Sequence, residues 1–220
     1  QGPVLETEGI TIGAVESVQG ISWTEITIEG QSNHAGTTPM SMRRDAGYVA
    51  GEISTHVRQI ANQIGGTQVG TVGKIDLHPN LVNVVASKAS MTVDLRNTSE
   101  MILRESESYL ATFCEEISEK ENVTISSKSL ARFEPVEFDN KLIETISSTA
   151  DNLGFSNRRM TSGAGHDAQI LARVCPSAMI FVPSKGGLSH NPEEYTSLEE
   201  VSAGANVLLH AILNVAGECS

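Results

Sequence analysis

The segment from Ala89 to Arg96 alternates without a break between apolar and polar side chains, and no other feature limits the fold as strongly. Ala, Met, Val and Leu take every second position, and Ser, Thr, Asp and Arg take the positions between them. A period of two places the apolar set on one face of a β-strand and puts Asp94 and Arg96 together on the other. The strand therefore belongs to a sheet that is covered on one face.

Two amphipathic helices are predicted around this strand. In the first, at 43–64, apolar residues recur every three or four positions, and Gly65-Gly66 ends the helix. The second, at 99–120, has Ser99 as its N-cap residue and an apolar face of its own. Further β-rich runs predict strands at 21–29, 67–77 and 123–130. The order β-α-β-β-α-β is that of a ferredoxin-like fold, in which one sheet carries two helices on a single face.

Outside this unit, the sequence alternates between predicted strands and helices, as in an α/β domain. A short strand at 10–18 precedes the unit, and Glu134-Pro135 marks a boundary after it. Beyond that boundary we expect a helix at 140–153, a glycine-rich turn at 162–166 that leads into a helix ending at 173, a buried strand at 178–182 and a last helix at 198–215. Only two of these strands are convincing, which is too few for an α/β sheet. The fold class expected is therefore α/β, with a partial α/β domain at 1–18 and 134–220 interrupted by a separate unit at 19–133.

Composition and charge narrow the function classes. The 220 residues are 39% apolar and 19% charged, which is ordinary for a globular protein, and no apolar run is long enough to span a membrane. A net charge of −12 disfavours nucleic acid or an anionic membrane as the main partner. The widely spaced Cys114, Cys175 and Cys219 form neither a disulfide framework nor a zinc-binding pair, which favours a reducing, cytoplasmic location. The chain opens with Gln1-Gly2-Pro3 and no methionine, so we expect a piece of a longer protein.

Three of the six histidines lie in loops beside glycine. They are His34 in NHAGTTP, His166 in GAGHD and His190 in GGLSHNPEE. A single loop histidine is most often merely solvated, but a neutral imidazole is also a common metal ligand and proton carrier, and nearby glycines let the backbone approach a ligand. His190 has the strongest case as a metal ligand. It follows a buried strand, and Glu193 or Glu194 could accept the proton of its second ring nitrogen.

Two more polar residues are candidates for carboxylate binding. The guanidinium of Arg96 is suited to pair with a substrate carboxylate or, with equal weight, with Asp94 two residues away. Asn83 is suited to bind a carboxylate or an amide, or merely to form a turn. Ser162 lacks the preceding glycine of a nucleophile elbow, which disfavours a serine hydrolase.

Seven stretches of the sequence, taken in order, resemble one enzyme family. They are QGPVLE (1–6), GQSNHAGTTPMSMRRDA (30–46), GTVG (70–73), PNLVNVVA (79–86), DLR (94–96), SGAGHDA (162–168) and FVPSKGGLSHNPEEYT (181–196). They resemble the N-carbamoyl-L-amino-acid hydrolases and allantoate amidohydrolases of the zinc aminopeptidase and aminoacylase superfamily. The resemblance implies that the unit at 19–133 is a lid domain, which also forms a homodimer and interrupts the catalytic domain.

The same resemblance implies roles for five residues. His34 is similar to the lid histidine that reaches the partner's active site and stabilises the oxyanion. Asn83 and Arg96 resemble the pair that holds the substrate carboxylate. Gly165 resembles a backbone contact to the substrate, and Gln1 resembles a glutamine that contacts the substrate.

A centre of two divalent ions is also implied, with zinc, manganese, cobalt or nickel as the candidates. His190 matches its last ligand. The other ligands, and the glutamate that activates water, are expected before residue 1, so this chain alone is expected to bind no metal. For His166 and Asp167 the resemblance implies only a place near the site.

These features predict a metal-dependent amidohydrolase. It would cleave a C–N bond of an N-carbamoyl amino acid or of a related acid such as allantoate, ureidoglycolate or a β-ureido acid. One alternative is a peptidase or aminoacylase of the same superfamily. The other is a non-catalytic lid and dimerisation module, supported by the complete β-α-β-β-α-β unit beside an incomplete catalytic part.

Overall fold

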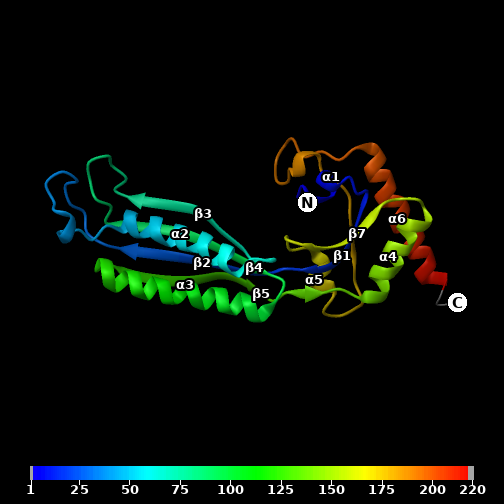
Figure 1. The fold of residues 1–220 in the computed structure, drawn as a ribbon, viewed down its shortest axis with the longest axis horizontal. Coiled ribbons are helices and arrows are strands. Elements are labelled where there is room, and N and C mark those ends of the chain that lie inside the picture. Colours follow the sequence, from blue (N-terminus) through cyan, green and yellow to red (C-terminus); the bar gives the residue numbers. More distant parts are fainter. Residues whose placement is uncertain (1, 218–220) are drawn as a thin grey trace. The chain divides into compact units, whose positions relative to one another are not determined.

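The protein folds as two compact units, and its structure, a computed structural model, describes residues 2–217 (Figure 1). Unit 1 is built from the chain up to Gln19 and from Val136 onward, and unit 2 is Gly20–Pro135. The expected boundaries, 18/19 and 133/134, differ from these by one and two residues. The catalytic and lid roles expected for the two units stay predictions.

Unit 2 contains its strands and helices in the order that the sequence predicts. They are β2 (Gly20–Glu29), the short 3-10 helix η1 (Met40–Met42), α2 (Ala46–Ile64), β3 (Val69–His78), β4 (Lys88–Asn97), α3 (Glu100–Glu121) and β5 (Thr124–Phe133). The sheet order is β3-β4-β2-β5, and every neighbouring pair is antiparallel. Strands that follow one another in the sequence are therefore not always neighbours in the sheet, because each helix connects two non-adjacent strands.

Local capping sets where the two helices begin. α2 begins three residues later than predicted, because the side chain of Asp45 caps it by accepting hydrogen bonds from the N–H groups of Gly47 and Tyr48. α3 begins after Ser99, whose hydroxyl accepts a hydrogen bond from the N–H of Ile102 at 3.5 Å, as the sequence predicts.

The core of unit 2 forms where one face of β4 packs against both helices. All four apolar residues of the alternating segment are buried, and Met91 packs in one cluster with Ile53 of α2 and Leu103 of α3. The polar residues of the segment are partly exposed on the other face, among them Asp94 and Arg96. No helix of unit 2 covers that second face, which we call the open face of the sheet.

Unit 1 has a mixed sheet, which confirms the α/β class. Its elements are α1 (Val4–Glu8), β1 (Ile12–Val18), β6 (Val136–Glu137), α4 (Asn140–Asn152), β7 (Asn157–Ser162), α5 (Asp167–Leu171), β8 (Met179–Phe181), the 3-10 helix η2 (Lys185–Gly187) and α6 (Leu198–Gly217). β1 is parallel to β7 and antiparallel to β6 and β8. The expectation of only two strands is therefore wrong, because β6 and β7 also join the sheet.

None of the helices in the described part of the chain is both long enough and apolar enough to cross a bilayer.

Met91 and Met101 offer a matched test of the unit 2 core. We expect Met91→Ala to lower the free energy of unfolding by about 2–5 kcal/mol, because it leaves a cavity in a fully buried site. The control Met101→Ala, at a side chain that is 75% exposed, should change it by less than about 0.5 kcal/mol. Chemical denaturation of both variants measures the difference, and equal losses would contradict this description of the core.

Candidate functional site

The guanidinium of Arg96 lies on the open face of β4, held by its neighbour Asp94. Its Nε donates to Asp94 Oδ1 at 3.0 Å, and its Nη2 donates to Asp94 Oδ2 at 2.7 Å. Ile21 of β2 and Val69 of β3 lie opposite Arg96 on the two neighbouring strands. The pairing that the spacing predicts is therefore present, and it fixes the plane of a guanidinium that is only 22% exposed.

His34 lies in the loop between β2 and α2, where main-chain donors set the tautomer of its ring. Its Nδ1 accepts hydrogen bonds from the N–H groups of Gly36 and Thr37 at 3.1 and 3.2 Å. A nitrogen that accepts these bonds carries no proton, so the neutral ring bears its proton on Nε2. The ring is exposed, and its Nε2–H is thus a hydrogen-bond donor suited to a developing negative charge.

The base of this loop is closed so tightly that only glycine fits. Gln31 N–H donates to the carbonyl of Arg44 at 2.9 Å, which joins the two ends of the loop. A Cβ at Gly30 would lie 2.1 Å from that same carbonyl oxygen. The glycine that opens the GQSNHAG motif therefore has a structural reason.

Asn83 lies beside His34, because the two loops that carry them are joined. The N–H of Ala35 donates to the carbonyl of Asn83 at 2.9 Å, and the N–H of Val85 donates to the carbonyl of Asn33 at 2.8 Å. An isolated antiparallel bridge pairs His34 with Val84. Figure 1 shows both loops together at one end of unit 2, beyond the ends of the strands.

Arg96 and Asn83 are not brought together. Asn83 precedes β4, whereas Arg96 is the last residue but one of this strand. The eight steps from Lys88 to Arg96 alone span about 26 Å at the rise of a β-strand. A single copy of the chain therefore does not bring the two residues together, and the expectation that they hold one carboxylate stays a prediction.

The glycine-rich turn of unit 1 follows the carboxyl end of β7, next to the carboxyl end of β1. The two strands are parallel, and Gln19 N–H donates to the carbonyl of Ser162 at 3.0 Å. Ligands of α/β proteins bind at such carboxyl ends. Ser162 is 1% exposed and donates its hydroxyl proton to the carbonyl of Ala164, so it is not an available nucleophile. Gly165 is exposed in this turn.

His166 follows the turn at the N-cap of α5 and is partly buried. Its ring lies against Phe181, the last residue of β8, with ring centroids 5.6 Å apart. Its Nε2 is buried without a hydrogen-bond partner in the described structure. Burial lowers the pKa of this ring below its ordinary 6.5, so the neutral form is favoured at pH 7.

His190 lies in the loop after β8, exposed and in a left-handed backbone conformation with φ 55°. Its N–H donates to Glu194 Oε2 at 3.0 Å. The glutamate that was expected to accept a hydrogen bond from the second ring nitrogen of His190 thus accepts one from its backbone N–H. A non-glycine residue with positive φ is uncommon and tends to occur at functional positions.

Within residues 2–217, no three or more His, Cys, Asp or Glu side chains gather into a group that could hold a metal ion. His190 is therefore not part of a metal site built from the described residues alone. Gln1 lies outside the described residues.

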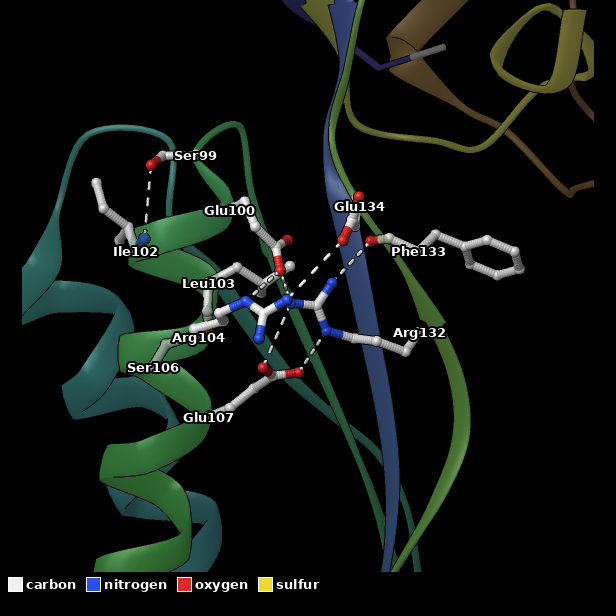
Figure 2. Close-up of polar contacts among 10 residues, drawn as sticks. All are labelled: Ser99, Glu100, Ile102, Leu103, Arg104, Ser106, Glu107, Arg132, Phe133 and Glu134. Atoms are coloured by element: carbon white, nitrogen blue, oxygen red, sulfur yellow. Dashed lines mark hydrogen bonds and ion pairs between the residues drawn. The ribbon is translucent and has the colours of Figure 1, made fainter. Parts of the chain in front are cut away.

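Unit 2 also contains a partly buried charge cluster that the sequence did not predict. Arg132 of β5 donates to Glu100 at 2.8 Å and to Glu107 at 2.7 Å, both on α3 (Figure 2). Glu100 also pairs with Arg104 at 2.6 Å, while the Oε2 atom of Glu100 is buried without a hydrogen-bond partner in the described structure. The cluster ties α3 to the end of the sheet that carries Arg96. Its only signal in the sequence is the spacing of Glu100 and Glu107, which places them on one helix face.

The chain thus carries an antiparallel β-α-β-β-α-β unit inserted into an α/β unit. The chain belongs to peptidase family M20/M25/M40, whose model matches residues 1–214. It is 41% identical to an N-carbamoyl-L-amino-acid amidohydrolase of Rhizobium meliloti, over 98% of this chain and 52% of the relative. It is 38% identical to an allantoate amidohydrolase of Escherichia coli, over 94% and 51%.

A solved structure of a hydantoinase/carbamoylase family amidase from Burkholderia multivorans superimposes with a TM-score of 0.94. It is 39% identical and is matched over 97% of this chain and 52% of its own length. The chain thus spans about half the length of the curated relatives it matches.

The lowered pKa of His166 has a consequence for stability. The unfolded chain keeps the ordinary value of 6.5, so below that pH it binds a proton that the folded state resists. The free energy of unfolding should therefore fall as the pH drops below 6.5, and less steeply in His166→Asn. Denaturation curves between pH 7 and pH 5 measure this. An NMR titration midpoint for His166 at or above 6.5 would show that the ring is not desolvated.

Proposed function

We propose that the complete protein is an amidohydrolase of ureido acids. It would hydrolyse the C–N bond of an N-carbamoyl amino acid or a related acid to give ammonia, carbon dioxide and the free amino compound. The observation that carries the proposal is the guanidinium of Arg96, oriented by Asp94 on the open face of the sheet. An oriented guanidinium is suited to the carboxylate that all these substrates share. The names of the relatives at 38–41% identity support the same substrate class.

We further propose that each active site is shared between two copies of the chain. Arg96 would serve the site of its own copy, and His34 with Asn83 would serve the site of the neighbouring copy. Two observations support this division: the main-chain bonds that join the loops of His34 and Asn83, and the length of β4 that separates both from Arg96. In this role the Nε2–H of His34 donates a hydrogen bond to the oxygen that becomes negative during attack.

Enzymes of this family are generally metal-dependent. The residues described here do not form a metal site by themselves, and His190 would contribute one ligand at most. We propose that the remaining ligands, and the base that activates water, belong to the half of the relatives' length that this chain does not match.

The surface of unit 1 supports this proposal. An apolar groove of about 710 Å³ lies between α4, β8 and α6, lined by residues such as Ile146, Ile180 and Leu208. α6 also exposes Leu209 and Leu213, each by more than half. Exposed apolar side chains gathered along one groove often mark a place where other protein packs. This groove is suited to receive further layers of the same α/β domain.

A substrate panel with the complete enzyme tests the proposed reaction. Ammonia should be released from carbamoyl amino acids or allantoate, whereas dipeptides and acetylated amino acids should be poor substrates. Arg96→Ala should lower kcat/KM by about 100-fold, largely through KM, because charged hydrogen bonds to the carboxylate are lost. Arg104→Ala, which removes an exposed arginine on α3, is the control. Cleavage of dipeptides but of no ureido acid would contradict the proposal.

Mixed dimers test the shared site. Assayed at substrate concentrations well below KM, Arg96→Ala and His34→Ala should each be nearly inactive alone. When they are unfolded and refolded together in equal amounts, half of the dimers are mixed and one of their two sites is intact, so about a quarter of the activity should return. His34→Ala mixed with Asn83→Ala should regain nothing, because each of the two sites in a mixed dimer then carries one of the two changes and neither site is intact. Recovery in the second mixture but not in the first would overturn the proposal.

A further inference from the structure

A small hollow lies on the open face of unit 2, next to the residue that orients Arg96. It has a volume of about 240 Å³. Trp23 of β2 and Leu130 of β5 supply its apolar walls, and further lining comes from Thr71, Gly73, Thr92 and Asp94.

The register of the sheet fixes how this hollow relates to Arg96. Trp23 lies directly opposite Asp94 on the neighbouring strand, so both side chains rise from the same face. Asp94 in turn holds Arg96 at 2.7–3.1 Å. The guanidinium and the aspartate therefore follow one another along β4, and the indole lies beside the aspartate on β2, next to the hollow.

Two large apolar side chains at the hollow are exposed. Trp23 is 40% exposed and Leu130 is 46% exposed, and neither belongs to the buried core of unit 2. The charge of Asp94 at the rim is compensated by Arg96, so the hollow presents apolar surface beside a neutralised pair. Binding an apolar group over such a surface is favourable, because apolar area is removed from water.

We propose that this hollow is the subsite for the side chain of the substrate. This inference rests on the proposed function, in which Arg96 binds the carboxylate. In an N-carbamoyl amino acid the side chain and the carboxylate leave the same carbon atom, so a carboxylate at Arg96 brings the side chain to the rim of the hollow. An unbranched or branched apolar chain of three or more carbons fits this volume and chemistry. Allantoate and ureidoglycolate carry no apolar chain at that position.

The test compares N-carbamoyl-L-leucine with N-carbamoylglycine in the complete enzyme. The ratio of their kcat/KM values isolates the contribution of the side chain. We expect the enzyme to favour the leucine compound, and Trp23→Ala to reduce that preference by about tenfold or more while leaving the glycine compound nearly unaffected. Trp23→Phe should keep most of the preference. The control Tyr109→Ala removes a similarly exposed aromatic side chain from α3 and should leave the ratio unchanged.

A second variant fills the hollow instead of enlarging it. A Cβ at Gly73 would meet only Thr92 Oγ1, at 3.8 Å, so Gly73→Val adds a side chain to the lining without a clash. It should lower kcat/KM for the leucine compound and spare the glycine compound, and it keeps the test decisive if Trp23→Ala does not fold. An enzyme that cleaves both compounds with a ratio that neither variant changes would overturn the subsite. An enzyme that cleaves no ureido acid would instead overturn the proposed function.

Discussion

One-sided burial of β4 is the constraint on which the rest of unit 2 depends. The four apolar residues of the alternating segment are buried against α2 and α3, and this commits the other four to the opposite face. A shift of one residue in register would bury Asp94 and Arg96 and expose Met91 and Leu95, which no helix packing could offset. The same alternating pattern therefore sets both the fold and the site geometry, because the packing that stabilises the sheet also places the guanidinium of Arg96 on the open face.

Much of this could be predicted from the sequence, because the signals are local. The alternation at 89–96, the helical spacing of apolar residues and the Ser99 cap each depend on a few neighbouring residues, and the structure confirms the elements they predict. β7 was missed because its sequence, NRRMTS, is polar and lacks alternation. It becomes a strand only through its pairing with β1, a contact between residues more than 140 positions apart.

The candidate site was harder to predict than the fold, because its geometry depends on distances between segments and on which copy of the chain supplies each residue. A resemblance between motifs names residues but does not say which copy of the chain each one serves. Asn83 and Arg96 are 13 positions apart, and a predicted strand fills most of that interval. The rise of that strand already implied a separation too large for one carboxylate, so the sequence held the signal. The surroundings of His166 had no such signal, since they depend on the place of Phe181 in the folded unit.

The joined loops of His34 and Asn83 have a thermodynamic consequence. If these loops complete the site of a neighbouring copy, a bound substrate touches two chains at once and stabilises their association by mass action. Assembly and substrate affinity would then be linked, so dilution would weaken binding and depress the rate per chain with every side chain intact. Because the length of β4 keeps Arg96 away from the loops of its own chain, only a dimer would be active and a single chain would not turn over substrate.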